Sequence, residues 1–402
     1  MNKKTGLFVL LVFLSPFVSG DSLVLQDYKQ RFSTADLWEK TEILLSALDD
    51  RTMDEEIGQF HEYALQFVLD NYAQTEEDEE ADDIVDISLR GFIDNIVDIS
   101  LKGIIDTGRS ESLNLLRRLF FEYQDSQAGA EIMIAMGILG KGNRAVTEMI
   151  NDYLIERNLL FSLGMDVDYT MVSACITAIM KLGDSSSYPA LFTSICAGYP
   201  EVIASEAYGA LELIHGNLYH FLIGIIEGGL PDEKLAAFRA GVNSERLTVS
   251  ERGQLAELAF EHGLSADDDD ADLALMRYAA VQELTRLRWT RAGANALRHF
   301  YRVQADFRQD AVPKERMIEA IACLGAVGGS EAALALGLQL GLINAMMKSS
   351  GSFDAEITLA LVQALGLIGD NAAFDHLLFT SSLPYPNNIK AAAQEALDRL
   401  KW

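Results

Sequence analysis

Leu324-Gly-Ala-Val-Gly-Gly-Ser330 and Leu365-Gly-Leu-Ile-Gly-Asp-Asn371 are two similar stretches that decide the predicted fold. The second starts 41 residues after the first, and each one ends an apolar segment and precedes another. Related stretches start at Leu139, at Leu182 and, more weakly, at Leu213. Glycine closes helices in the left-handed conformation, and Asp or Asn then caps the next helix. We therefore predict a repeating unit of helix, tight turn and helix, with a period of roughly 42 residues.

Apolar residues on either side of these stretches follow the helical period. Two examples of a single apolar face are Ile357, Leu361, Leu365 and Ile368, and Val172, Ile176, Ile179 and Leu182. One helix pair cannot bury such a face alone, so each pair needs its neighbours on both sides. There is no convincing pair of strands, and the sequence therefore predicts an all-α chain of stacked helix pairs.

HEAT-type repeats are the family that these blocks resemble, most closely at residues 320–334 and 362–374 and less closely at 135–150 and 178–195. The resemblance implies an α-solenoid, in which antiparallel helix pairs stack into an armadillo-like (ARM-type) superhelix. It covers residues 128–227 and 272–402. The remaining mature residues, 21–127 and 228–271, are helical by pattern, and degenerate repeats and caps both remain open for them.

The chain is divided accordingly. We expect a signal peptide at 1–20, an N-terminal helical region at 21–127, HEAT-like repeats at 128–271, and C-terminal HEAT-like repeats with a capping helix at 272–402. Within the N-terminal region, residues 84–95 are repeated almost literally by residues 96–107. Twelve residues are about three and a third helical turns, so we interpret this duplication as a helix that grew and not as a functional motif.

The first twenty residues predict an export signal. Lys3 and Lys4 precede an apolar run at residues 7–14, and Val18-Ser19-Gly20 fits a signal-peptidase site with cleavage after Gly20. The run is too short to cross a bilayer, which takes about 20 residues. A short anchor that is never cut is the alternative. We expect an exported, periplasmic protein with no transmembrane segment after signal removal.

Composition excludes several classes of protein. The chain has 402 residues, 49% hydrophobic and 23% charged, with 60 acidic against 32 basic side chains and a net charge of −28. It is too apolar to be disordered. So acidic a chain repels phosphate backbones, and we expect no nucleic-acid partner. Three cysteines are too few for a disulfide-stapled scaffold.

Cys175 and Cys196 are placed at similar heights in one predicted hairpin. An exported protein can oxidise such a pair if the Cα atoms approach within about 7 Å, and two buried thiols are the preferred alternative. Two acidic runs, at residues 76–83 and 267–270, are expected to be solvated loops. The second run lacks the glycine and glutamate of a calcium-binding EF-hand loop. The six histidines are scattered, so we expect no metal and no cofactor.

One basic cluster opposes the global charge. It is interleaved with Trp289, Phe300, Tyr301 and Phe307, and its members are Arg286, Arg288, Arg291, Arg298, His299, Arg302 and Arg308. Arginine and aromatic side chains are typical anchors of protein interfaces. We therefore take Arg291, Arg298, His299, Arg302 and Trp289 as candidate partner-binding residues. The alternative is that these arginines neutralise neighbouring acidic helices and loops.

The sequence favours a non-enzymatic scaffold that binds a protein or peptide through a concave surface. A structural or assembly factor of the cell envelope is the second hypothesis. An enzyme that uses two carboxylates on the concave side is the third, but it needs one carboxyl group with a raised pKa beside another. No spacing in the chain singles out such a pair. The oligomeric state is open at this point.

Overall fold

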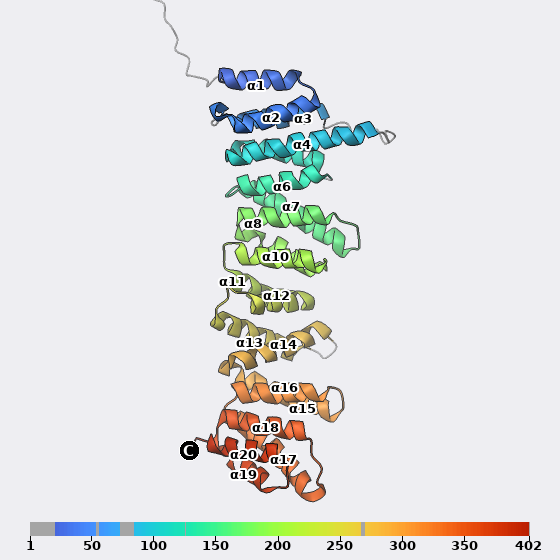
Figure 1. The fold of residues 1–402 in the computed structure, drawn as a ribbon. Helices are drawn as coiled ribbons and strands as arrows, with labels where there is room; N and C mark the ends of the chain where they lie inside the picture. The colour runs from blue at the N-terminus through green and yellow to red at the C-terminus, as the bar shows by residue number, and fades with distance from the viewer. Residues whose placement is uncertain (1–20, 54–55, 73–83, 125, 267–269, 402) are drawn as a thin grey trace, which may run out of the picture. The chain divides into compact units, whose positions relative to one another are not determined.

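The computed structural model of the chain describes residues 21–53, 56–72, 84–124, 126–266 and 270–401. These residues form twenty α-helices with short 3₁₀ helices between some of them (Figure 1). They contain no β-strand, only an isolated bridge between Asp370 and Lys401. The all-α prediction is confirmed. The predicted signal peptide at 1–20, the acidic run at 76–83 and residues 267–269 of the second acidic run lie outside the described residues.

Residues up to Ala190 form the first of two compact units. Consecutive helices pack against each other, and α2, α4, α6 and α8 also pack each on the next of that series. The helices of this unit are α1 (Leu23–Thr34), α2 (Leu37–Asp49), α3 (Ile57–Tyr72), α4 (Ile84–Asp106), α5 (Leu113–Tyr123), α6 (Gln127–Leu139), α7 (Arg144–Ser162) and α8 (Tyr169–Leu182). Helix α9 (Tyr188–Cys196) contains the division between the units.

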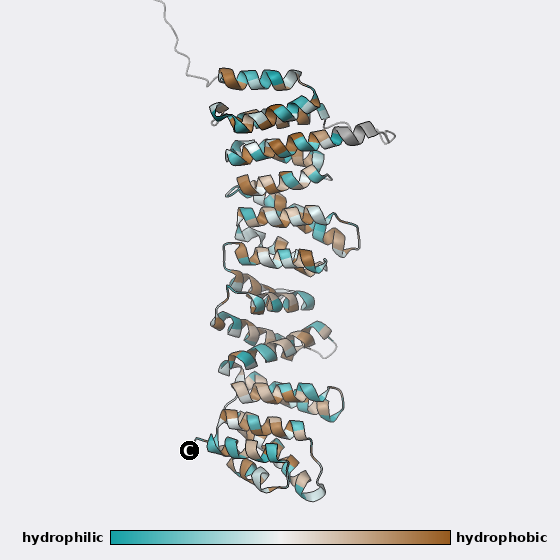
Figure 2. Ribbon diagram, in the orientation of Figure 1, coloured by the Kyte–Doolittle hydropathy of each residue, from teal (hydrophilic) through white to brown (hydrophobic). Residues whose placement is uncertain are grey.

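The second unit runs from Leu191 to the end of the chain. Its helices are α10 (Glu201–Leu213), α11 (Leu218–Gly228), α12 (Pro231–Asn243), α13 (Val249–Ser265), α14 (Ala271–Leu287), α15 (Gly293–Arg308), α16 (Lys314–Val327), α17 (Ser330–Ser350), α18 (Ala355–Ile368), α19 (Phe374–Ser382) and α20 (Asn387–Asp398). Helices α12, α14, α16, α18 and α20 pack each on the next and form the even row. Helices α11, α13, α15, α17 and α19 do the same and form the odd row. Apolar residues recur along both rows, where they meet in the core (Figure 2).

Helix-ending glycines occupy most of the predicted turns. Gly183 and Gly369 adopt the left-handed conformation, with φ of 67° and 68°, and Asp184 and Asp370 cap the helices that follow. Gly328 differs, because its φ is −80°. A Cβ there would come within 2.3 Å of the Ala332 side chain. Glycine is therefore needed at this turn for close approach and not for a left-handed backbone.

Helix α17 is as long and apolar as a membrane span, by length and composition alone, and no other helix among the described residues meets both criteria. The expectation that no transmembrane segment follows the signal stays a prediction. The helix packs against α16, α18 and α19. It buries Asn344, whose side-chain amide donates hydrogen bonds to the His376 carbonyl and to Thr380 Oγ1 at 3.1 and 3.0 Å.

The duplicated block forms a single helix, α4, as predicted. Its two equivalent glycines, Gly91 and Gly103, have opposite surroundings, because twelve residues turn a helix by about 120° beyond complete turns. Gly91 is exposed and has open space where a Cβ would lie. Gly103 is buried, and a Cβ there would come within 2.0 Å of the His61 ring.

The matched glycines give a direct test of this packing. We expect Gly91→Ala to stabilise the protein by up to about 1 kcal/mol, because alanine favours helix. Gly103→Ala should destabilise it by about 1–3 kcal/mol, because the His61 ring must move. Urea unfolding followed by circular dichroism measures both. Equal effects of the two substitutions would contradict the packing of α3 on α4.

His61 is a fully buried titratable group of the first unit. Neither ring nitrogen has a hydrogen-bond partner among the described residues, and burial lowers the pKa of His61 from 6.5 to about 4. The folded state therefore keeps this ring neutral at a pH where the unfolded chain already binds a proton. The contribution of the neutral ring to the free energy of unfolding is fully present above about pH 6.5. It is lost progressively as the pH falls toward about 4.

We predict that His61 makes the free energy of unfolding fall by about 1.4 kcal/mol per pH unit in this window. His61→Leu should reduce the slope by that amount, whereas His215→Leu, which replaces an exposed histidine, should leave the slope unchanged. Urea midpoints between about pH 7 and pH 5 provide the measurement. An unchanged slope in His61→Leu would rule out the neutral buried ring.

Candidate functional site

Two open grooves lie on the odd row of the second unit and share Tyr219. The first has a volume of about 330 Å³ and is lined by residues 216–219, 246, 247 and 251. The second has a volume of about 290 Å³ and is lined by residues 219, 223, 227, 254, 257, 258, 261 and 291. Together they run across α11 and α13, so we call them the α11–α13 grooves.

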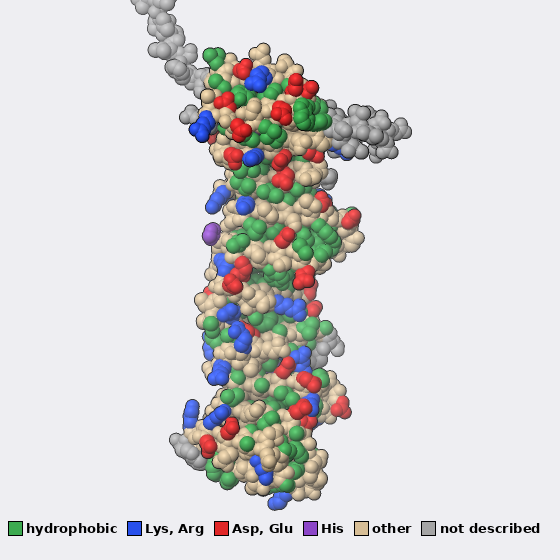
Figure 3. Space-filling model, in the orientation of Figure 1, with side chains coloured by type: hydrophobic (Ala, Val, Ile, Leu, Met, Phe, Trp, Pro, Cys, Tyr) green, Lys and Arg blue, Asp and Glu red, His purple; other side chains and the backbone are tan. Residues whose placement is uncertain are grey.

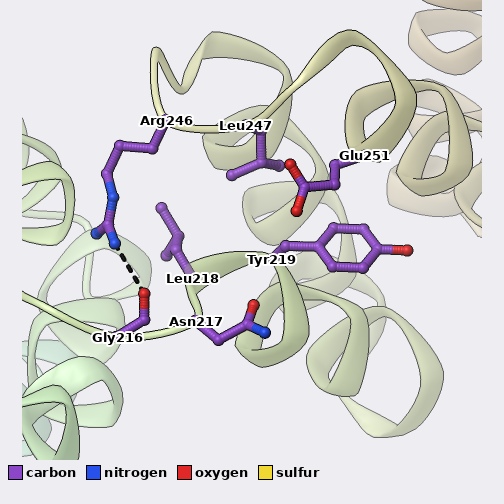
Figure 4. A pocket seen from close by; sticks show the side chains of 7 residues that line it. All are labelled: Gly216, Asn217, Leu218, Tyr219, Arg246, Leu247 and Glu251. Carbon is purple, nitrogen blue, oxygen red and sulfur yellow. Dashed lines mark hydrogen bonds between the residues drawn. The ribbon is translucent and has the colours of Figure 1, made fainter.

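The first groove is built from helix ends. Arg246 donates hydrogen bonds to the carbonyl oxygens of Leu211, Ile214 and Gly216, at 3.1, 2.7 and 2.8 Å. These are carbonyls at and beyond the end of α10, which have no intrahelical partner. In Figure 4 Arg246 and Gly216 lie on one side of the groove, and Tyr219 and Glu251 on the other. Arg246 therefore fixes one wall of the groove.

Thr248-x-x-Glu251 is the sequence pattern of a capping box, and the structure contains that box at the start of α13. The Glu251 carboxylate accepts hydrogen bonds from the backbone N–H and the hydroxyl of Thr248, at 2.8 and 2.7 Å. These bonds lower the pKa of Glu251. The capping box places a charged carboxylate at the mouth of the first groove.

The second groove has acidic walls and one basic edge. Glu227, Glu257 and Glu261 line it, and Arg291 pairs with Glu257 across 3.3 Å. Trp289 Nε1 donates to the same carboxylate at 2.9 Å. The Trp289 ring rests on Gly253, where a Cβ would come within 2.4 Å of it. Glu257 thus joins α13 to the turn before α15 through two of the predicted residues.

Tyr219 connects the two grooves. Its hydroxyl donates to Gln254 Oε1 at 2.9 Å. Burial raises the pKa of Tyr219, the carboxylates of Glu251 and Glu227 raise it further, and Arg291 lowers it. The phenol therefore stays protonated at neutral pH and keeps its role as a donor.

The predicted partner-binding residues divide into two groups. Trp289 and Arg291 meet at Glu257, and Arg298 lies on the exposed face of α15. Arg302 donates to the carbonyl oxygens of Leu264 and Ala266, at 3.2 and 3.4 Å, and so caps the end of α13. His299 is 0% exposed and lies against the rings of Phe260 and Tyr278.

His299 is therefore part of the core and not of the exposed face. Burial lowers its pKa from 6.5 to about 3, with smaller contributions from Arg277, Arg302 and Arg316. The neutralising alternative fits Arg291, which pairs with Glu257, whereas Arg302 donates to backbone carbonyl oxygens at the end of α13. Arg298 is different, because it donates a long hydrogen bond of 3.4 Å to Asn295 Oδ1 on its own helix.

The cysteines are reduced in the structure. None of the three is disulfide-bonded, and Cys175 and Cys323 are buried. Burial raises the pKa of Cys196 to about 12 and that of Cys323 to about 11, so neither is a ready nucleophile. Across the described ranges, no three His, Cys, Asp or Glu side chains come together as metal ligands.

Comparisons with known proteins give little further information. No protein-family profile matches the chain, and no curated protein matches it. Among solved structures, an engineered protein is similar over 93% of this chain and 98% of its own, at 14% sequence identity and a TM-score of 0.36. A likeness of that level carries no argument about fold or function.

Several groove residues had no distinguishing signal in the sequence. Tyr219, Gln254 and Glu257 are ordinary members of helical segments, and only the capping box pointed to the mouth of the first groove. The spacing between partners is the regularity that could have found them. Tyr219 and Gln254 are 35 residues apart, as are Leu211 and Arg246, which is close to one repeat.

We predict that Arg246→Met destabilises the protein by about 1–2 kcal/mol, because three carbonyl oxygens lose a charged donor. Arg298→Met serves as the matched control and should change the free energy of unfolding by less than about 0.5 kcal/mol, as is usual for an exposed site. Urea unfolding of the two variants makes the comparison. A stable Arg246→Met protein would show that the wall of the first groove does not depend on this side chain.

Proposed function

We propose that the chain is an exported, non-enzymatic scaffold of HEAT type that binds a protein or peptide partner. In this proposal the helix pairs stack into an α-solenoid, and the exposed faces of α13 and α15 form the partner-binding surface. In the first unit α2, α4, α6 and α8 pack each on the next, and in the second unit the even row and the odd row do the same. This packing supports the proposal, because nearest-neighbour packing is what stacked repeats share. The export signal and the periplasmic location are part of the proposal.

The exposed surface of α13 and α15 is the observation that carries this function. It combines the acidic second groove with Arg298 and Tyr301, and Tyr301 is 49% exposed. Arginine, tyrosine and tryptophan are the residues that most often anchor interfaces. Figure 3 shows acidic, basic and apolar side chains interspersed on the face in view, with no single-sign field. Charges are also mixed on α13 and α15, where Glu257 and Glu261 lie on α13 and Arg298 and Arg308 on α15, and this suits a folded or peptide partner better than a polyanion.

The partner that fits carries both charges. Acidic groups would face Arg298 and Arg308, and a basic group would face Glu227 and Glu261 in the second groove. Arg302 and His299 contribute indirectly, since one caps α13 and the other fills the core beneath α15. This division of roles determines which substitutions test the site without disturbing the fold.

The test is a comparison of proteins that co-purify from the native host. We expect Arg298→Glu to reduce the amount of retained partner at least about tenfold. The new glutamate places a negative charge opposite the acidic group of the partner that Arg298 would face, and the two charges repel each other. Arg144→Glu makes the same change of charge at a side chain of the first unit that is 90% exposed, and it should retain the partner. Quantitative mass spectrometry measures the ratio.

Equal retention by both variants would contradict partner binding at α15. Loss in both variants would show a dependence on net charge alone. Circular dichroism of the two proteins confirms that each is folded, so that a lost partner reports on the surface and not on the core.

A further inference from the structure

The exposed face of α17 is unlike that of any other helix in the odd row. Leu334, Leu338, Leu342 and Met346 are 54%, 63%, 57% and 52% exposed. They recur every four residues and so form one straight ridge along the helix. Between Glu331 and Lys348 this face has no charged residue. We call these four side chains the α17 ridge.

The ridge has apolar neighbours on α19. Leu378 and Phe379 are 48% and 39% exposed, and α19 packs directly on α17. Lys348 Nζ lies 5.7 Å from the centre of the Phe379 ring, and this contact joins the C-terminal end of α17 to α19. On the other side, Gln304 of α15 donates to Gln339 of α17 at 2.8 Å. The ridge is thus the middle of a surface that is three helices wide.

The opposite side of α17 already has its hydrogen-bond and packing partners within the second unit. Asn344 is bonded to His376 and Thr380, and Tyr385 donates to its side-chain oxygen at 3.0 Å. Gly337 and Gly341 face the His376 ring, at 3.0 and 2.9 Å from where a Cβ would lie. Burial of the ridge therefore cannot come from a rotation of α17 within its own unit, and it requires a second surface.

The shape of the ridge indicates what that surface is. Ridges of residues four apart interlock with ridges of the same kind on a facing helix, at a crossing angle of about −50°. This packing class is symmetric, because both helices use the same rows. A second α17, related by a two-fold axis, supplies the matching ridge with no further requirement. A closed two-fold contact of this kind is also the commonest form of self-association.

Area and charge agree with that occupant. The six apolar side chains of α17 and α19, each about half exposed, leave on the order of 500 Å² of apolar surface. Stable dimers bury roughly 800 Å² per partner, of which about two thirds is apolar. The chain as a whole carries a net charge of −28. The uncharged ridge is the place where two copies can meet without bringing like charges into contact.

We propose that the protein forms a homodimer through the α17 ridge, with α17 crossing its own copy near Leu338 and Leu342 and with Leu378 and Phe379 at the edge of the contact. This inference is independent of the proposed partner site, which lies on α11, α13 and α15. Either can fail while the other holds.

Size-exclusion chromatography with light scattering tests the dimer on the full mature chain. We expect a dimer at micromolar concentration, and we expect Leu338→Glu or Leu342→Glu to weaken it by at least about 100-fold. Leu275→Glu places the same charge on an exposed leucine of α14, in the even row, and should leave the dimer unchanged. Arg298→Glu should also leave it unchanged, which separates this contact from the partner site.

A covalent trap locates the axis. Residues next to a two-fold axis lie close to their own copies, so Leu338→Cys or Leu342→Cys should form a disulfide-linked dimer on mild oxidation, and Leu275→Cys should not. If the wild-type protein is monomeric at all concentrations, the proposal is wrong. A peptide or a membrane would then be the occupant of the ridge. A dimer that survives both glutamate variants, or that is trapped as readily through residue 275, overturns it as well.

Discussion

The packing of a helix on the helix two places further along the chain, as in α2–α8 and in the two rows of the second unit, is the constraint on which the rest of the structure depends. No helix pair here can bury its apolar face alone, so each pair supplies part of the core of the next. Polar side chains reinforce the same step: Asn158 donates to the Ala190 carbonyl, and Asn344 donates to the His376 carbonyl. Both bonds join residues 32 apart, which is one helix pair.

The turns were predictable because their chemistry is local. Gly183 and Gly369 adopt a left-handed backbone. The side chains of Asp184 and Asp370 accept hydrogen bonds from backbone N–H groups only two residues further on. Those requirements are written within a few neighbouring residues. The two α4 glycines show where this reasoning ends. Gly91 and Gly103 stand in nearly identical sequence, yet only Gly103 is pressed against His61.

The candidate site was predictable only in part, for the same reason. The density of arginine and aromatic residues drew attention to α15 and the turn before it, and Trp289, Arg291 and Arg298 lie at or near the surface there. What each one does depends on the helix before it. Arg302 caps α13 and His299 fills the core, and neither role follows from a spacing within α15. The partners of these residues lie about one repeat away.

The odd row carries the functional proposals because its exposed faces differ from helix to helix. Each odd helix satisfies its core with one face, which leaves the opposite face without a structural requirement. On α13 that face is acidic, on α15 it carries Arg298, Tyr301 and Arg308, and on α17 it is a ridge of leucines and a methionine. Four exposed apolar side chains in line do not stabilise a face that stays in water, because the free-energy cost of hydrating each side chain remains. The ridge therefore has an energetic reason to be covered, whereas the charged faces beside it are stable in water and are suited to a partner that comes and goes.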